Sequence, residues 1–253
     1  MNKKYFFFDI DGTLTIKGKV SYIPKSVVKT LKKLRDNGHF VAIATGRAQV
    51  LSKEFAAEVG VNNIVSDGGN GLTLNGELVD IEPLDNTLAL SLIDEALSKN
   101  FRLGVSVNNT TTLYSRDMDT SLEKYYDIVI DPNYDFHKQD KIFKIFIQVT
   151  EEEEHKIDGL HNLGYMRYIP ESILIEPDEK YRGIRRVMEH LNAPIKDVVV
   201  FGDGHNDISM FKAAPFSIAM GNAIDELKEI ASFVTKTNVE DGIEYACKHF
   251  NWI

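Results

Sequence analysis

The sequence of 253 residues predicts an α/β fold, in which a mostly parallel sheet with helices is interrupted by an inserted α+β segment. Strand and helix patterns alternate from the N-terminus. An antiparallel pattern replaces them after about residue 83, and the alternation returns near Gly183. We therefore expect a core domain in two parts, residues 1–82 and 179–253, and an inserted domain at 83–178.

The elements of the first core segment follow from the spacing of their apolar residues. Tyr5–Phe8 is a continuous aromatic run, which is typical of a strand buried on both faces. Pro24 opens a helix whose apolar residues 27, 28, 31 and 34 share one face, and Gly38 is a plausible stop for it. The sequence then predicts a strand at 40–44, a helix at 50–59 and a short strand near 64–65.

The inserted segment carries signals of an antiparallel sheet with helices on one side. Just before the inserted segment, Asn75-Gly76 stands between two short apolar runs and is the strongest local signal for a two-residue hairpin turn. Thr150 with Glu153 forms a capping box for a following helix. The other elements predicted here are a helix at 88–97 and strands at 101–107, 111–115, 141–149, 165–169 and 172–176. Beyond the insert, a helix at 184–191 precedes a fully apolar strand at 198–201.

Composition limits the classes of partner. The net charge of −9 provides no excess of Lys and Arg, which argues against a nucleic-acid-binding surface. No apolar run approaches the roughly 20 residues that span a bilayer. The one cysteine, Cys247, excludes an internal disulfide and fits a reducing compartment. We expect a cytoplasmic protein that is a monomer or weak homodimer, with no nucleic-acid or membrane partner.

Two carboxylates separated by one residue, Asp9 and Asp11, follow the first predicted strand. Such carboxylates raise each other's pKa unless a cation neutralises them, and hard oxygen ligands suit Mg²⁺ together with a substrate phosphate. Asp9 is suited to accept a phosphoryl group as a nucleophile, and Asp11 to protonate the leaving oxygen and then deprotonate water. An Asp-Gly pair after a strand is also common turn chemistry. The pair alone therefore leaves both interpretations open.

Two further segments offer groups that bind phosphate. The hydroxyl of Thr45 and the amide of Gly46, followed by Arg47, lie at a predicted strand-to-helix turn, although a simple helix cap is the favoured explanation of this segment taken alone. Lys180, with Arg182 two residues on, precedes the helix at the return from the insert. A cation there would stabilise an ionised nucleophile and a transferring phosphoryl group.

The segment from Gly202 to Asp207 holds two carboxylates and an amide in a glycine-bounded loop after an apolar strand. Asp203 is the best candidate for a second carboxylate on Mg²⁺. Asn206 and Asp207 fit the remaining ligands or the groups that orient them, with Asn206 also a candidate phosphate contact. A turn rich in Asp and Asn that caps the next helix would account for one acidic residue, but poorly for the whole set.

These segments together resemble the haloacid dehalogenase-like superfamily, and within it the Cof-type sugar-phosphatase branch. The resemblance rests on Asp9-Ile10-Asp11-Gly12-Thr13, Ala44-Thr45-Gly46-Arg47, Lys180 and Gly202–Asp207, and it spans essentially the whole chain. It implies a Rossmann-like core and an inserted α/β cap, with Asp9 as nucleophile, Asp11 as acid and base and Thr45 as phosphate binder. It also implies Mg²⁺ held by Asp9, the backbone carbonyl of Asp11, and Asp203.

The sequence departs from the family pattern at two points. Many relatives have Lys directly before the glycine, whereas this chain has Lys180-Tyr181-Arg182-Gly183. We favour Lys180 over Arg182 for the lysine role, because a guanidinium does not fit every compact ammonium site. The usual Asn-Gly-Ala appears as Asn70-Gly71-Leu72, so that Asn70 is a candidate substrate contact.

The sequence-based hypothesis is a Mg²⁺-dependent phosphatase that acts on a small phosphorylated metabolite, with a sugar phosphate expected. A phosphotransferase such as a sugar phosphomutase would share this core and pass the phosphoryl group to a sugar hydroxyl. A third hypothesis is a binding module without catalysis. The presence of Asp9, Asp11, Lys180 and Asp203 together argues against that last alternative.

Overall fold

The computed structural model describes residues 2–16, 21–119, 122, 124–177 and 179–253. Contacts divide the chain into two compact units, one made of residues 1–81 and 179–253 and the other of residues 82–178. Asp178, at which the sequence analysis ended the inserted domain, lies outside the described residues. Among the described residues, no helix combines the length and the apolar character that crossing a bilayer requires.

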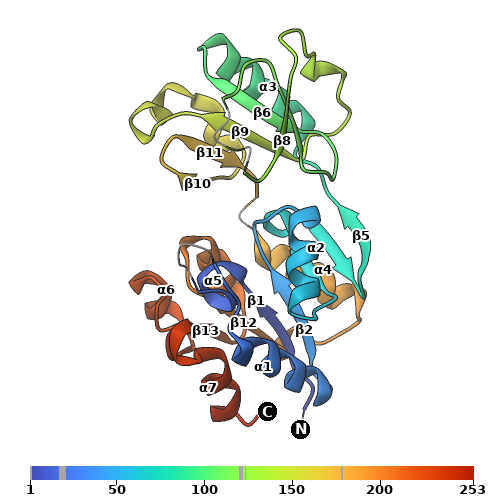
Figure 1. Ribbon diagram of the computed structural model, residues 1–253, viewed down its shortest axis with the longest axis vertical. Helices are drawn as coiled ribbons and strands as arrows, with labels where there is room; N and C mark the ends of the chain where they lie inside the picture. The colour runs from blue at the N-terminus through green and yellow to red at the C-terminus, as the bar shows by residue number, and fades with distance from the viewer. Residues whose placement is uncertain (1, 17–20, 120–121, 123, 178) are drawn as a thin grey trace. The chain divides into compact units, whose positions relative to one another are not determined.

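The first unit is built on an eight-stranded sheet with the order β14-β13-β12-β1-β2-β3-β4-β5 (Figure 1). The six strands from β14 to β3 run parallel, and β4 and β5 add an antiparallel hairpin at one edge. Asn75 and Gly76 both have positive φ at the turn of that hairpin, as the sequence pattern predicted. The strands are β1 (Tyr5–Phe8), β2 (Phe40–Ala44), β3 (Ile64–Ser66), β4 (Gly71–Leu74), β5 (Glu77–Ile81), β12 (Val198–Gly202), β13 (Ser217–Ala219) and β14 (Phe233–Val234).

Helices cover both faces of this sheet. Phe6 and Phe8 of β1 pack into a cluster with residues of α1 (Lys25–Asp36), α2 (Gln49–Glu58) and α7 (Gly242–His249). Tyr5 and Phe7 point to the other face, into a cluster with residues of α4 (Lys180–His190), α5 (Ile208–Ala213) and α6 (Asp225–Ile230). A central strand buried on both faces requires a continuous apolar run, which explains the aromatic sequence of β1.

The second unit is a six-stranded sheet with the order β10-β11-β9-β6-β7-β8, with α3 (Asn86–Ser98) packed on one face. Neighbouring strands are antiparallel except β7 and β8, which are parallel. Leu92 and Ile93 of α3 share a core with Val105 and Ile147 of the sheet. The strands are β6 (Arg102–Ser106), β7 (Thr112–Ser115), β8 (Asp127–Ile130), β9 (Lys144–Gln148), β10 (Tyr165–Ile169) and β11 (Ser172–Ile175).

The second unit differs from the sequence prediction in two details. The helix expected after Thr150 is instead a pair of short 3-10 helices, Glu151–Lys156 and Asp158–Asn162. Four consecutive glutamates repel one another, and the backbone amides of Asp158 and Gly159 donate to the Glu95 carboxylate of α3, so that tertiary contacts decide this segment. Strand β8 was not predicted, because its four residues carry no alternating pattern and three of them are largely exposed.

Candidate active site

The carboxyl ends of three adjacent parallel strands bring the predicted site residues of the first unit together. Phe8 of β1 lies beside Ile43 of β2 and Phe201 of β12 in register. The residues that follow these strands, among them Asp9, Thr45 and Asp203, therefore gather at the same edge of the sheet. In open parallel sheets that edge is where ligands bind.

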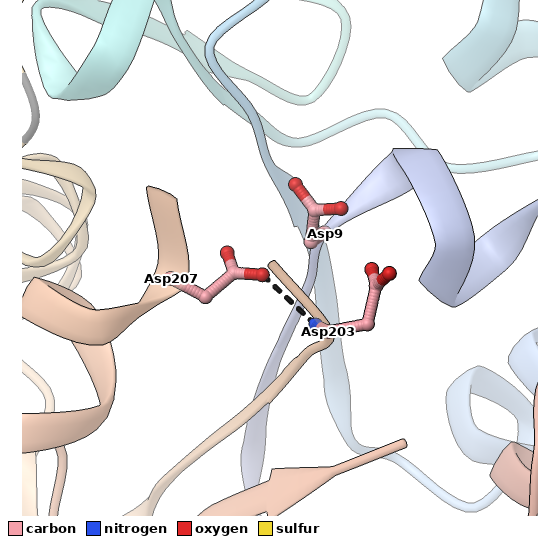
Figure 2. Close-up of side chains that lie close together, drawn as sticks. All are labelled: Asp9, Asp203 and Asp207. Atoms are coloured by element: carbon pink, nitrogen blue, oxygen red, sulfur yellow. Dashed lines mark hydrogen bonds between the residues drawn. The ribbon is translucent and has the colours of Figure 1, made fainter. Parts of the chain in front are cut away.

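A buried ammonium group joins two carboxylates at this edge. Lys180 Nζ lies 2.7 Å from Asp9 Oδ1 and 2.7 Å from Asp207 Oδ1, and donates a hydrogen bond to each. The side chain of Lys180 is 1% exposed, those of Asp9 and Asp207 are buried as well, and Asp203 is a buried neighbour. Figure 2 shows the three carboxylates, which come from the end of β1 and from the loop after β12.

Burial and charge work against each other in this cluster. Desolvation raises the pKa of Asp9 to about 7, although the adjacent Lys180 ammonium lowers it, and the negative charges of Asp207 and Asp203 raise it further. Burial by itself lowers the pKa of Lys180, but Asp207 and Asp9 together outweigh burial and raise that pKa above its ordinary value. Lys180 is therefore charged at neutral pH, and the carboxyl group of Asp9 titrates near neutral pH.

The loop after β12 is closed by its own last carboxylate. Asp207 Oδ2 accepts a hydrogen bond from the backbone amide of Asp203 at 2.9 Å (Figure 2) and another from the backbone amide of Gly204 at 3.1 Å. A Cβ at Gly202 would lie 2.5 Å from Asp207 Oδ2, so only glycine allows this closure. Asp207 thus shapes the loop with one oxygen and holds Lys180 with the other, while Asn206 lies half-buried in the same turn.

The loop after β1 supports Asp203 from the opposite side. Gly12 has φ +98°, and a Cβ there would lie 2.1 Å from Asp203 Oδ2. The Thr13 hydroxyl donates to Asp203 Oδ1 at 3.0 Å. The Asp-Gly-Thr sequence therefore does more than form a turn, because its glycine and threonine seat the carboxylate of a distant segment.

The cluster has the composition of a cation site. Asp9, Asp203 and Asp207 each offer a carboxylate oxygen, and these oxygens lie within 4.8 Å of one another. Asp207 uses one oxygen to accept from Lys180 and the other to accept from two backbone amides of its own loop. Three carboxylates and one ammonium give the cluster a formal charge of −2 when all are ionised. A hard divalent cation fits both the oxygen donors and this buried charge.

The predicted phosphate-binding residues lie next to this cluster along the sheet edge. Thr45 is buried directly after β2, and its hydroxyl oxygen accepts from the backbone amide of Arg47 at 3.2 Å. Arg47 extends its side chain to Asp11 and donates from Nε to Oδ2 at 2.9 Å and from one terminal nitrogen to Oδ1 at 2.6 Å. The candidate acid and base and the candidate phosphate-binding arginine are thus hydrogen-bonded to each other.

Comparison with known proteins identifies the family. Residues 6–246 match the family model described as haloacid dehalogenase-like hydrolase. The chain belongs to this family. It is 34% identical over 253 residues to YkrA of Bacillus subtilis (strain 168), a protein provisionally named as a phosphatase, with 98% of each chain covered. It is 28% identical to the 5-amino-6-(5-phospho-D-ribitylamino)uracil phosphatase YwtE of the same strain, with 96% of each chain covered.

Solved structures of similar proteins share the fold over the whole length. A hypothetical protein from Geobacillus kaustophilus HTA426 is 30% identical, with a TM-score of 0.86 and full coverage of both chains. BT1666 from Bacteroides thetaiotaomicron, described among phosphatases of the haloalkanoate superfamily, is 25% identical, with a TM-score of 0.84 over 99% of this chain and 96% of that one. The α/β fold expected from the sequence is confirmed for this haloacid dehalogenase-like hydrolase.

The lysine position of this hydrolase was the open point of the sequence analysis. Lys180 contacts Asp9, whereas Arg182 donates to Asn70 Oδ1 at 2.6 Å and pairs with Glu179 at 3.2 Å. Arg186 donates to the backbone carbonyl of Asn70 at 3.0 Å. Asn70 is buried, and it joins the loop after β3 to the helix that carries Lys180.

Two asparagines that the sequence analysis missed hold the loop after β1. The side-chain amides of Asn222 and Asn238 both donate to the Gly12 carbonyl, at 2.9 and 3.0 Å, and Asn238 donates to the Thr15 carbonyl at 2.8 Å. The backbone amide of Asn238 in turn donates to Asn222 Oδ1. Asn222 follows the end of β13, the next strand of the parallel sheet, so strand order was the signal that would have pointed to it.

Proposed function

We propose that this hydrolase is a Mg²⁺-dependent phosphatase that acts on a small phosphorylated metabolite, with a sugar phosphate as the expected class, through an aspartyl-phosphate on Asp9. Family membership and the phosphatase names of its relatives support the phosphatase activity. The contact of buried Lys180 with Asp9, beside Asp203, is the observation that carries the mechanism. A buried carboxylate next to an ammonium group and a cation site is an activated nucleophile.

The reaction takes two steps on residues of this chain. A carboxylate oxygen of Asp9 attacks phosphorus in line, the bond to the leaving oxygen breaks, and Asp11 gives that oxygen a proton. Water then attacks the phosphorus of the aspartyl-phosphate, Asp11 takes its proton, and the bond to Asp9 breaks to release inorganic phosphate. Lys180 offsets negative charge on Asp9 and on the transferring group. Thr45, Gly46 and Asn206 are the proposed phosphate contacts.

Mg²⁺ is the proposed metal because the cluster supplies oxygen donors and a formal charge of −2. Asp9 and Asp203 would hold it together with the backbone carbonyl of Asp11, and Asp207 orients Asp203 and Lys180. A bound divalent cation would offset charge on the phosphoryl oxygens. We also propose that residues 83–178 act as the cap domain that selects the substrate, as the resemblance to the sugar-phosphatase branch implies.

The direct test is phosphate release from a panel of sugar phosphates and other phosphorylated metabolites, with Mg²⁺ or with EDTA. Wild-type protein should release phosphate only with the metal, and Asp9→Asn should abolish turnover. Asp36→Asn is the matched control, because Asp36 pairs with Lys32 on α1 and both side chains are more than half exposed. Acid-quenched wild-type enzyme should carry a phosphoryl group that Asp9→Asn lacks.

Three outcomes would contradict the proposal. Full turnover by Asp9→Asn would remove the nucleophile assignment, and full turnover in EDTA would remove the metal. Isomerised sugar phosphate in place of free phosphate would make the protein a phosphomutase. Tight binding of a phosphorylated ligand without any turnover would make it a binding module.

A further inference from the structure

Arg47, one of the predicted phosphate-binding residues, is paired with the Asp11 carboxylate. Two parallel N–H···O contacts, at 2.9 and 2.6 Å, join the guanidinium to both oxygens of the Asp11 carboxylate. Bidentate pairs of this kind add directional specificity to charge attraction. The side chains of Arg47 and Asp11 are 36% and 48% exposed, so burial contributes only in part to holding the Asp11 carboxylate in one orientation.

The backbone of Arg47 is held on both sides, which gives the guanidinium a rigid base. Its amide donates to Thr45 Oγ1 at 3.2 Å, and its carbonyl accepts from the Asp67 amide at 3.0 Å and the Ser52 hydroxyl at 3.3 Å. The guanidinium carbon also lies 5.7 Å from the centre of the Phe55 ring, in cation–π contact. Backbone, ring and carboxylate together define one position for this side chain.

Lys180 already supplies the cation that contacts the nucleophile. Its compact ammonium is buried against Asp9, whereas the Arg47 guanidinium faces the residue proposed to move protons. The two cations of the site thus contact different catalytic carboxylates. We infer that Arg47 is a positioning residue that acts on the reaction through Asp11. It holds the ionised carboxylate in the orientation from which Asp11 takes the proton of the attacking water, and it is not the phosphate-binding group.

This inference rests on the proposed function and deepens it, since it assigns the orientation of the acid and base to one side chain. Arg47→Lys keeps the positive charge and loses the two-point contact. We expect kcat for a sugar phosphate to fall by about 10- to 100-fold, as for the loss of a charged hydrogen bond. The affinity for inorganic phosphate, titrated by calorimetry in Mg²⁺, should change by less than about twofold.

A double-mutant cycle separates positioning from other roles. In an Asp11→Asn background, the residual turnover of 4-nitrophenyl phosphate, whose leaving group needs no proton, should be nearly unchanged by Arg47→Lys. Arg185→Lys is the matched control, because Arg185 is exposed and 3.7 Å from Glu189 in α4, and this substitution should leave kcat unchanged in both backgrounds.

Two results would overturn the inference. Phosphate affinity that weakens in Arg47→Lys by the same factor as kcat/KM would make Arg47 a phosphate ligand. Additive losses from Arg47→Lys and Asp11→Asn would show that Arg47 acts independently of Asp11. Failure of the proposed function has another signature, because wild-type protein itself would then release no phosphate.

Discussion

Among the described residues, each unit of this hydrolase buries one lysine against a carboxylate, and the two groups of side chains differ in formal charge. Lys144, at the start of β9, pairs with Glu176 after β11, and both side chains are at most 2% exposed. Lys180 in the first unit is equally buried, yet it faces Asp9 and Asp207 with Asp203 beside them. The side chains of Lys144 and Glu176 sum to a formal charge of zero, whereas those of Lys180 and the three aspartates sum to −2.

The difference in formal charge distinguishes a structural ion pair from a candidate binding site. In a buried ion pair the two charges offset each other, so no ligand is needed to neutralise them. Removing one partner lowers the free energy of unfolding, because the other charge stays buried without its counterion. An excess of buried negative charge destabilises the fold unless a cation joins it, and it therefore indicates a binding site. Burial of a lysine alone would not have distinguished the two.

The largest expected effect comes from the same substitution made in each cluster. Lys180→Met removes the ammonium beside the nucleophile and should lower kcat by about 10⁴-fold, or about 5.5 kcal/mol of transition-state stabilisation. Lys144→Met should change kcat by less than about threefold, or about 0.6 kcal/mol. Initial rates at a temperature where both variants are folded test this, and equal losses would remove the distinction between the clusters.

The Lys144–Glu176 pair should matter for stability rather than for activity. Lys144→Met leaves Glu176 buried without its lysine and should lower the free energy of unfolding by about 3–5 kcal/mol. Adding Glu176→Leu should recover most of that loss. The one tryptophan, Trp252, lies in the first unit, so its fluorescence reports that unit, while far-ultraviolet circular dichroism reports both. A destabilised double variant would mean that the pair itself stabilises the second unit.

Mg²⁺ binding should stabilise the first unit through the cluster of Asp9, Asp203 and Asp207. Mg²⁺ at 100 times its dissociation constant should raise the free energy of unfolding by about 2.7 kcal/mol, since it binds only the folded state. The Trp252 signal should show this shift in wild type and in the Lys144→Met/Glu176→Leu variant, and lose it in Asp203→Asn. An unchanged shift in Asp203→Asn would place the ion elsewhere.

The raised pKa of Asp9 predicts how metal-free stability depends on pH. With a folded-state pKa of about 7 against an ordinary value of 3.8, the native protein binds more protons than the unfolded chain between these values. Stability should therefore fall as pH rises across this interval, by at most about 1.4 kcal/mol per pH unit. The raised pKa of Lys180 does not alter this slope, because that lysine is charged in both states throughout the interval. The pH slope of the unfolding free energy should be smaller by this contribution in Asp9→Asn and unchanged in Asp36→Asn. Denaturation in EDTA at several pH values measures it.

The smallest expected effect concerns the support of the cluster by Asn238. Asn238→Ala removes side-chain hydrogen bonds to the Gly12 and Thr15 carbonyls and should weaken Mg²⁺ binding by about fivefold, or about 1 kcal/mol. Asn238→Leu, which keeps a similar size without charge and loses the amide donor, should do the same. Calorimetric titration of the metal is the measurement. Unchanged affinity in both variants would confine Asn238 to a structural role.

Much of this architecture was already contained in local sequence patterns. The aromatic run of β1, the apolar spacing of α1 and the Asn75-Gly76 turn each specify a conformation through nearby residues, and the structure confirms all three. The helix predicted after Thr150 was wrong. Two 3-10 helices stand there instead, and the second of them contacts Glu95 of α3, which is distant in the sequence. Local sequence patterns predict the structure correctly where local interactions dominate. They fail where contacts with a segment distant in the sequence dominate.

The sequence by itself determined which residue types stand at the strand ends, because a carboxylate or hydroxyl after an apolar strand is a local feature. Only the tertiary structure decided the partners: Lys180 on Asp9 across 171 positions, Arg182 on Asn70, and Arg47 on Asp11. The two asparagines on Gly12 came to light in the same way. A hydrogen bond depends on distance and direction, and these arise only when strands far apart in the chain lie side by side.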